Sequence, residues 1–279
     1  MSRKLFQIYQ AQPSRDGAGV KINRIAGKEM NRVLDPFLMI DEINADSAAD
    51  YIGGFPEHPH RGFETITYMK AGRMRHRDHM GNEGVIEPGD VQWMTAGRGV
   101  LHSEMPEQEE GLMHGFQLWL NLPAKDKLKP AAYRDIRAAE IASYRDDNGS
   151  EVRVIAGEVG IDGQRLKGCL PAMPTRPLLL DVSVAAGEEF SLSLGDYERV
   201  LVFVYAGGST ELSSKQLAVY GKGDKLSLQA GPQGLGALVL SGEPLREPIA
   251  QYGPFVMNQP EEIEQAIRDF QAGTLLSPA

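Results

Sequence analysis

The sequence predicts an all-β protein built from two tandem β-barrels, and three observations point to this fold. The chain has 279 residues, which is long for one hydrophobic core and suggests two domains. Its 31 glycines and 17 prolines recur at short intervals and separate runs rich in β-branched and aromatic residues, a pattern typical of a sandwich or barrel. The third observation is a faint internal repeat.

The strand-like runs fall into two groups along the chain. The first group lies at residues 63–69, 85–94 and 115–122. The second group lies at residues 151–159, 176–184, 198–206, 225–230 and 236–241. Helical periodicity is scarce in both groups, so we expect only a few short helices besides one at the C-terminal end.

The repeat relates the first-half stretches "ETITYMKAG", "VIEPGD" and "VQWMTAG" to "RVLVFVYAG", "VYGKGD" and "KLSLQAG". Gly72 and Gly89 are 17 positions apart, and Gly207 and Gly223 are 16 apart. Such self-similarity suggests two copies of one barrel unit. All six histidines lie between residues 58 and 114, so their placement follows a site rather than the architecture. On this spacing, the counterparts of His58, His60, His102 and Glu104 are Ser193, Gly195, Gly236 and Leu238.

We expect an N-terminal barrel over residues 1–130 and a C-terminal barrel over 131–279, with the polar segment 125–150 as the connection. A helix is predicted over 260–272, at the end of the second barrel. Pro260 suits the first helical position, Glu261 and Glu262 suit the positive end of the helix dipole, and Gly273 can end the helix. An apolar stripe should pack on a barrel and could tie the two domains together: Ile263, Ala266, Ile267 and Phe270.

Composition excludes several classes of function. The net charge of −9 and the pI near 5.3 disfavour nucleic acid and anionic membranes as partners. A single cysteine, Cys169, allows no disulfide within the chain. No stretch has the apolar length of a signal peptide or a transmembrane helix, so we expect a cytoplasmic protein.

The strongest functional pattern is a pair of motifs with ligand-type residues one position apart. His58 and His60 flank Pro59, which favours an extended chain, and residues i and i+2 of a strand share one face. His102 and Glu104 repeat this spacing. Two such strands could enclose one metal ion inside a barrel. Three imidazoles and a carboxylate suit iron, zinc, copper or nickel, and the lack of thiolates argues against a structural zinc site.

Four other residues leave alternatives open. Glu64 has the same strand parity as His58 and His60 and competes with Glu104 as the carboxylate ligand. His76 and His79 lie in the charged stretch "RMRHRDHMGNEG", and we expect both to be solvated. His114 lies in an apolar run and is either a satisfied core histidine or a pocket residue.

Specific stretches also resemble a known family. "HPHRGFE" is similar to the first cupin motif, and Gly99 with His102 resembles the end of the second, although its usual proline is absent from "AGRG". "DPFLMIDEI", "HPHRGFETITY", "PGDVQWMTAGRGVLHSE", "HGFQLWLNLP" and "GEPLREPIAQYGPFVMN" resemble the pirin family. The resemblance implies two tandem cupin barrels of jelly-roll type, covers nearly the whole chain, and rests on highly specific N-terminal motifs.

The resemblance also implies a site. Pirins hold a metal only in the N-terminal barrel, through residues that correspond here to His58, His60, His102 and Glu104. This favours Glu104 over Glu64 as the ligand, and Glu64 would stand behind a ligand histidine and hold its other ring nitrogen. We expect one divalent transition metal per chain, with Fe(II) ahead of zinc, copper, nickel, manganese and cobalt.

Members of the pirin family are linked to quercetin 2,3-dioxygenase activity, in which O₂ cleaves a flavonol ring and CO is released. The resemblance therefore implies a small aromatic substrate, O₂ as co-substrate, and Glu104 as the base that takes the hydroxyl proton. The alternative that the family offers is a metal-binding regulatory protein that acts on protein partners, and another cupin reaction is a third. We expect the pocket walls to include Phe55, Met74, Trp93, Met94, Phe116 and Leu118.

Overall fold

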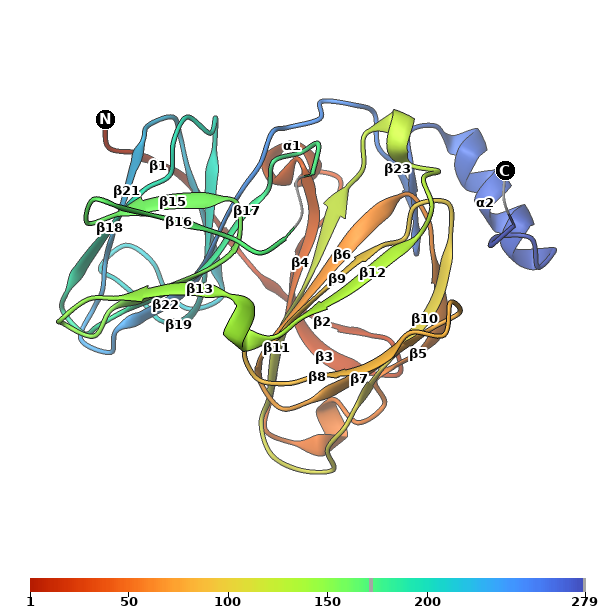
Figure 1. Ribbon diagram of the computed structural model, residues 1–279, viewed down its shortest axis with the longest axis horizontal. Helices are drawn as coiled ribbons and strands as arrows, with labels where there is room; N and C mark the ends of the chain where they lie inside the picture. The colour runs from red at the N-terminus through yellow and green to blue at the C-terminus, as the bar shows by residue number, and fades with distance from the viewer. Residues whose placement is uncertain (171–172, 278–279) are drawn as a thin grey trace. The chain divides into compact units, whose positions relative to one another are not determined.

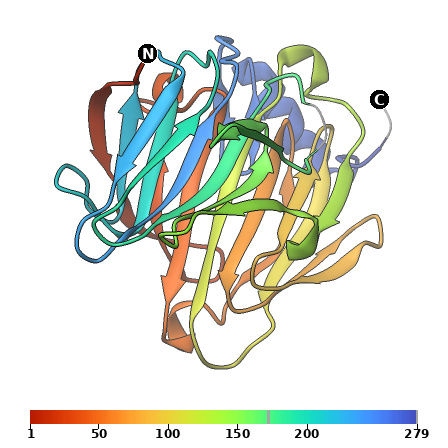
Figure 2. The same ribbon diagram turned by 60° about the vertical axis from the view of Figure 1, so that its left-hand side comes forward.

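The computed structural model of the chain describes residues 1–170 and 173–277, and strands make up most of it. Contacts divide the chain into two units. The N-terminal barrel comprises Pro13–Ala138 with Leu245–Ala279, and the C-terminal barrel comprises Met1–Gln12 with Ala139–Pro244. The expected all-β architecture with two barrels is confirmed, and Figures 1 and 2 show the strands of each barrel side by side.

The N-terminal barrel consists of a seven-stranded and a four-stranded sheet. The larger sheet has the order β12-β9-β6-β11-β4-β3-β2, and the smaller has the order β5-β10-β7-β8. In chain order the strands are β2 (Gln12–Asp16), β3 (Val20–Ala26), β4 (Phe37–Ala45), β5 (Phe55–His60), β6 (Phe63–Ala71), β7 (Met74–Asp78), β8 (Glu83–Ile86), β9 (Val91–Thr95), β10 (Val100–Pro106), β11 (Met113–Asn121) and β12 (Ala132–Ile136).

The C-terminal barrel repeats this layout. Its larger sheet has the order β1-β20-β19-β22-β17-β14-β13, and its smaller sheet has the order β16-β15-β18-β21. The strands are β1 (Leu5–Gln10), β13 (Ala142–Arg145), β14 (Glu151–Ala156), β15 (Glu158–Ile161), β16 (Gln164–Lys167), β17 (Leu178–Val184), β18 (Glu189–Ser193), β19 (Val200–Gly207), β20 (Gln216–Tyr220), β21 (Lys225–Gln229) and β22 (Leu235–Ser241).

The order of strands in the two sheets shows that the repeat spacing paired some strands of the two barrels wrongly. The spacing matched β9 to β21, but β9 lies beside β6 as β20 lies beside β19. The hairpin β7–β8 of the N-terminal barrel has no strand counterpart in residues 208–215, and this insertion displaces the match by one strand. The counterpart of β10 is therefore β21, and Gly236 and Leu238 on β22 do not correspond to His102 and Glu104.

Apolar side chains fill the corresponding place in the C-terminal barrel. β5 and β10 pair in the N-terminal barrel, and β18 and β21 pair in the same relation. Across the second pair, Phe190 lies opposite Leu228 and Leu192 opposite Leu226, and all four are buried in the core of that barrel. The C-terminal barrel therefore has apolar packing where the N-terminal barrel has His58 and His102.

The ends of the chain belong to different barrels than the division at residue 130 implies. The first strand, β1, pairs with β20 and completes the C-terminal barrel. The last residues instead join the N-terminal barrel as β23 (Ala250–Tyr252), β24 (Phe255–Met257) and α2 (Pro260–Gln271). The segment 125–150 is also more than a connection, because β12 joins β9 of one barrel and β13 joins β14 of the other.

The C-terminal helix begins and ends as its sequence signals predict. Gln259 precedes it in a reciprocal capping box with Glu262, and Pro260 occupies its first turn. Ile263 and Ala266 are buried against Phe255 and Met257. Phe270 was expected in the same buried stripe, but it is 43% exposed and touches Phe255 only edge to face. The described residues also contain one short α-helix, α1 (Asn31–Leu34), and three 3₁₀ helices, η1 (Ala48–Asp50), η2 (Ala124–Asp126) and η3 (Ala138–Glu140).

Two buried cations fasten the C-terminal segment to the N-terminal barrel. The Arg61 guanidinium donates to Asp269 (2.6 Å), to the Leu275 carbonyl (3.1 Å) and to the Arg98 carbonyl. The Lys127 ammonium donates to the carbonyl oxygens of Gly62 (2.9 Å) and Val256 (3.0 Å) and to Asn121 Oδ1 (2.7 Å).

Across the described residues, none of the helices combines the length and the apolar character needed to cross a lipid bilayer.

Candidate metal centre

Three histidines converge inside the N-terminal barrel because their strands are neighbours. In the smaller sheet, His102 on β10 lies directly opposite His58 on β5, and His60 follows two positions later on the same face. The Nε2 atom of His58 lies 3.0 Å from Nε2 of His60 and 3.0 Å from Nε2 of His102. His60 and His102 are almost fully buried. Among the described residues, this is the one group of three ligand-type side chains whose ligand atoms all lie within 4.8 Å of one another.

The hydrogen bonds of the ring nitrogens show that this arrangement suits a cation. A carbonyl oxygen only accepts, so His58 Nδ1 must donate to Pro56 O (2.8 Å) and His60 Nδ1 to Pro254 O (3.4 Å). Both Nε2 atoms then present lone pairs to each other. Burial lowers the pKa of His58, His60 and His102, which favours the neutral form of the three rings.

Lone pairs 3.0 Å apart repel unless a positive charge lies between them. Two imidazole nitrogens bound at right angles to one ion, each at ~2.1 Å, would lie about 3 Å apart, which matches the observed separation. The three rings therefore fit a divalent transition metal. Imidazole nitrogen is a ligand between hard and soft, which suits iron, copper, nickel, cobalt and zinc.

Glu104 lines the same cavity as His58 and His60, but its carboxylate is hydrogen-bonded to other side chains. Its carboxylate accepts hydrogen bonds from Thr67 Oγ1 (3.0 Å) and from Gln117 Nε2 (3.3 Å). The side chain is buried, and this burial raises the pKa of Glu104 to about 7. The structure thus brings Glu104 to the wall of the cavity, beside the compact group of three histidines.

Glu64 has a different role from the one expected for it. Its buried carboxylate accepts from Lys129 Nζ (2.8 Å) and Thr95 Oγ1 (2.8 Å). The Nδ1 atoms of His58 and His60 use backbone carbonyls instead, so neither ring is held by Glu64. This buried ion pair ties β6 and β9 to residues just before β12.

The other histidines divide into three environments. His79 is exposed, as expected, whereas His76 is completely buried, and its expected solvation is wrong. β7 pairs with β10 and places His76 directly opposite Glu104, so the ring points into the barrel. The alternation "MRHRD", with Met74 and His76 inside and arginines outside, carried this signal. His114 is a half-buried histidine whose Nε2 lies 3.2 Å from the buried carboxylate of Glu42.

A cavity of about 500 Å³ is lined by His58, His60 and Glu104. Phe55, Met74 and Phe116 line it as predicted, but Trp93, Met94 and Leu118 do not. An ion pair adds charge to the wall, because Arg24 donates to both oxygens of Asp41 at 2.8 and 2.6 Å. The C-terminal segment closes part of the wall with Gln251, Gly253 and Pro254.

Comparison with known proteins agrees with this geometry. Residues 19–120 match the family described as Pirin, and residues 179–276 match the Pirin C-terminal cupin domain. A Pseudomonas aeruginosa protein named "Putative quercetin 2,3-dioxygenase" is 48% identical, with 98% of each chain covered. Human pirin is 38% identical over 97% of this chain and 93% of its own length.

A solved structure also agrees with this family. The crystal structure named quercetin 2,3-dioxygenase from Acinetobacter baumannii superposes with a TM-score of 0.90, at 36% identity and 99% coverage of both chains. Both barrels, the three converging histidines and these relatives agree, and the chain belongs to the pirin family of two-barrel cupin proteins.

Proposed function

We propose that this protein is a metal-dependent dioxygenase that cleaves a flavonol or a similar enolic substrate with O₂, as quercetin 2,3-dioxygenases do. The observation that carries the proposal is the meeting of three imidazole Nε2 atoms at the side of a 500 Å³ cavity. The names of the Pseudomonas aeruginosa and Acinetobacter baumannii relatives support the substrate class.

In this proposal His58, His60 and His102 hold one divalent metal, with Glu104 as the fourth ligand and Fe(II) as the first candidate ion. When bound, such a metal lowers the pKa of a coordinated hydroxyl and supplies the electron chemistry that O₂ requires. The carbonyl partners of His58 and His60 fix the tautomers that this ligation needs.

Glu104 is the proposed general base. A catalytic base works best when its pKa lies near the working pH, and burial brings the pKa of Glu104 to about 7. Thr67 on β6 and Gln117 on β11 orient the carboxylate from the larger sheet of the barrel. Glu104 would take the proton of the flavonol 3-hydroxyl and leave an electron-rich enolate for reaction with O₂.

The cavity suits a flat aromatic substrate. Its volume falls within the range of ~300–1,000 Å³ that is typical of small-molecule pockets. Ile22, Met39, Met69 and Trp119 provide apolar surface for aromatic rings. His58, His60, Glu104 and the Arg24–Asp41 pair supply polar groups that would fix the orientation.

The test is to incubate iron-loaded protein with quercetin in air and to follow both the loss of flavonol absorbance and the release of CO. We expect turnover that requires O₂ and is lost in His102→Ala. A protein that binds iron at one site per chain but leaves quercetin intact would contradict the enzymatic proposal and favour a regulatory metal-binding protein.

A further inference from the structure

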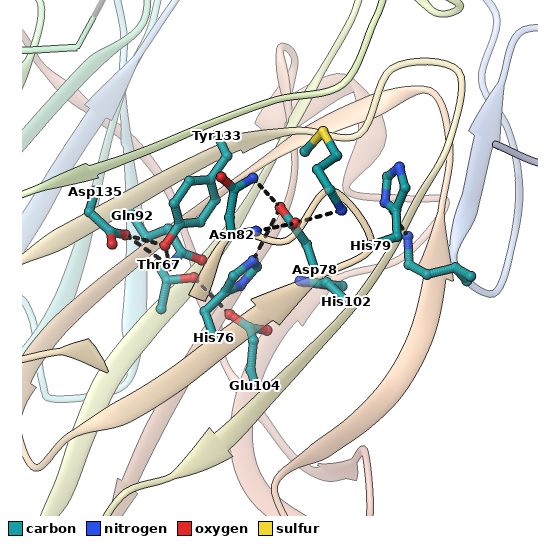
Figure 3. A network of polar contacts seen from close by, with 12 residues as sticks. Thr67, His76, Asp78, His79, Asn82, Gln92, His102, Glu104, Tyr133 and Asp135 are labelled. Carbon is teal, nitrogen blue, oxygen red and sulfur yellow. Dashed lines mark hydrogen bonds and ion pairs between the residues drawn. The ribbon is translucent and has the colours of Figure 1, made fainter. Parts of the chain in front are cut away.

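A fourth histidine lies behind the candidate metal centre and takes no part in the proposed ligand set. His76 on β7 faces into the barrel, and Figure 3 shows it beside His102, Glu104 and Asp78. Its ring centroid lies 5.2 Å from that of His102 and 4.9 Å from the stacked ring of Tyr133. The His76 side chain and the Asp78 side chain have no exposed surface.

Three ring nitrogens in this region have no hydrogen-bond partner in the described chain. They are Nδ1 and Nε2 of His76 and Nδ1 of His102. Nearly all buried polar atoms in folded proteins are paired, and each unpaired one costs ~1–3 kcal/mol. The two rings that carry these three nitrogens are neighbours, with centroids 5.2 Å apart, so the unpaired nitrogens call for one explanation.

The hydrogen bonds of Asp78 fix which nitrogens carry protons. Its Oδ1 accepts from the backbone N–H groups of Met80 (2.9 Å) and Asn82 (3.1 Å), and its Oδ2 accepts from Asn82 Nδ2 (2.8 Å). Asp78 is thus an acceptor throughout, and its Oδ2 lies 3.8 Å from His76 Nε2. The proton of a neutral His76 ring therefore belongs on Nε2, which leaves a lone pair on Nδ1.

His102 has the complementary tautomer. Its Nε2 faces Nε2 of His58 and must offer a lone pair if it is to bind a metal, so its proton belongs on Nδ1. A donor on His102 and an acceptor on His76 then lie on adjacent rings of neighbouring strands.

Tyr133 does not compete for this proton. Its hydroxyl donates to Asp135 (2.6 Å) and accepts from Gln92 (3.0 Å), so it presents only its ring face to His76.

We propose that His76 is a positioning residue that accepts a hydrogen bond from His102 Nδ1 through one bridging water, and is itself held by Asp78. The chain from Asp78 through His76 to His102 fixes the tautomer and tilt of the third ligand ring and raises its basicity. His58 and His60 receive the same support from backbone carbonyls, which His102 lacks. This inference rests on the proposed metal site and is independent of the flavonol substrate.

The test compares Co(II) affinity with the stability of the metal-free protein. In His76→Phe, a ring of similar shape keeps the packing on Tyr133 but removes both nitrogens. We expect its Co(II) dissociation constant to rise ~10–100-fold and its cobalt absorption bands to shift, while the melting temperature of the metal-free protein stays equal or rises. His76→Gln, which can still accept and donate, should recover most of the affinity.

Tyr133→Phe is the matched control, because it breaks the Gln92 and Asp135 bonds of the same network but leaves the ring on His76. It should bind Co(II) like the wild type. If His76→Phe does not fold, His76→Leu takes its place in the same assay.

Unchanged Co(II) affinity in folded His76→Phe, or in the His76→Leu that replaces it, would overturn the inference, as would an equal loss of affinity in Tyr133→Phe. Wild-type protein that binds no Co(II) would instead overturn the proposed metal site itself.

Discussion

Glu64 and Glu104 are both buried carboxylates of the N-terminal barrel, and their partners separate them. Glu104 faces the cavity and is held by two neutral groups, Thr67 and Gln117. Glu64 is neutralised by Lys129 and lies in the structural ion pair. Sequence parity alone could not distinguish them, because parity gives the face of a strand but not the neighbour on the next strand.

Substituting each glutamate by glutamine should therefore affect different properties: metal binding and turnover at Glu104, and stability at Glu64. Glu104→Gln should weaken metal binding without abolishing it and should lower flavonol turnover by ~10²–10⁴-fold, the usual contribution of a positioned base. Glu64→Gln should retain the metal but lower the free energy of unfolding by ~1–3 kcal/mol, because Lys129 loses its charged partner. Metal analysis and thermal melts of both variants distinguish the roles. A metal-free Glu64→Gln beside a metal-replete, active Glu104→Gln would reverse the assignment.

Lys127 gives a second prediction for a single residue. Lys127→Met fills the same space but leaves three buried acceptors, Gly62 O, Val256 O and Asn121 Oδ1, without their donor. Each loss costs ~1–3 kcal/mol, so denaturant unfolding should show a destabilisation of several kcal/mol. Lys125→Met, on the nearby exposed surface, should be neutral, and equal stability of the two variants would contradict the inferred role of Lys127.

The same lysine predicts a pH dependence of stability. Burial lowers the pKa of Lys127 from 10.5 to about 8 in the folded protein. Between these values the unfolded chain binds the proton more tightly than the folded chain, so the free energy of unfolding rises with pH across that window. The wild type should therefore gain stability from pH 8 to 10.5 relative to Lys127→Met. A constant difference between the two proteins over this range would show that the pKa is not lowered.

At the scale of the element, α2 was the most predictable segment and its packing the least. A proline, two glutamates and a glycine gave its bounds within one residue, because helix ends are determined by local chemistry. The helix packs on the N-terminal barrel through residues far away in the chain. The sequence of the helix alone does not show which barrel it joins. The exposure of Phe270 has the same cause.

Alanine substitutions along α2 test the observed packing. Ile263→Ala should lower the free energy of unfolding by ~2–4 kcal/mol, because the side chain is buried against Phe255 and Met257. Phe270→Ala removes a larger side chain but should cost less, since that ring is 43% exposed. Chemical denaturation of both variants gives the comparison, and a larger effect at Phe270 would show that the stripe packs as the sequence alone suggested.

The strand hairpin β7–β8 shows why part of the site escaped prediction. Its two strands are short and rich in charged residues, and their sequence alone predicts a solvated turn. Only the pairing of β7 with β10 turns Met74 and His76 inward. His58, His60 and His102 could be predicted as site residues from the sequence, because their one-apart spacing is itself typical of a strand.

At the scale of the molecule, one barrel carries the candidate ligand residues and the other carries leucines and a phenylalanine at the corresponding place. The all-β class and the number of barrels follow from local patterns that recur along the sequence. The exchange of chain ends between the barrels does not, because it depends on pairings such as β1 with β20, more than 200 residues apart.

This asymmetry predicts the metal content. Protein loaded with excess Fe(II) or Co(II) and desalted should retain about one ion per chain by elemental analysis, all of it in the N-terminal barrel. His102→Ala should lose most of the metal and keep its fold, since two separate cores support the chain. A content near two ions per chain, or global unfolding of His102→Ala, would contradict this division of roles.

The exchange of chain ends also has a consequence for synthesis. The ribosome releases the histidine strands early, but Pro254, which supports His60, and Val256, which receives Lys127, emerge only near the end. Domains usually fold in order as they leave the ribosome. Here the barrel that begins first must wait for the last segment, and β1, made at the outset, must wait for β20. The proposed metal site is therefore completed only after residues 250–257 have been made, so a chain truncated before residue 245 lacks the wall that supports His60.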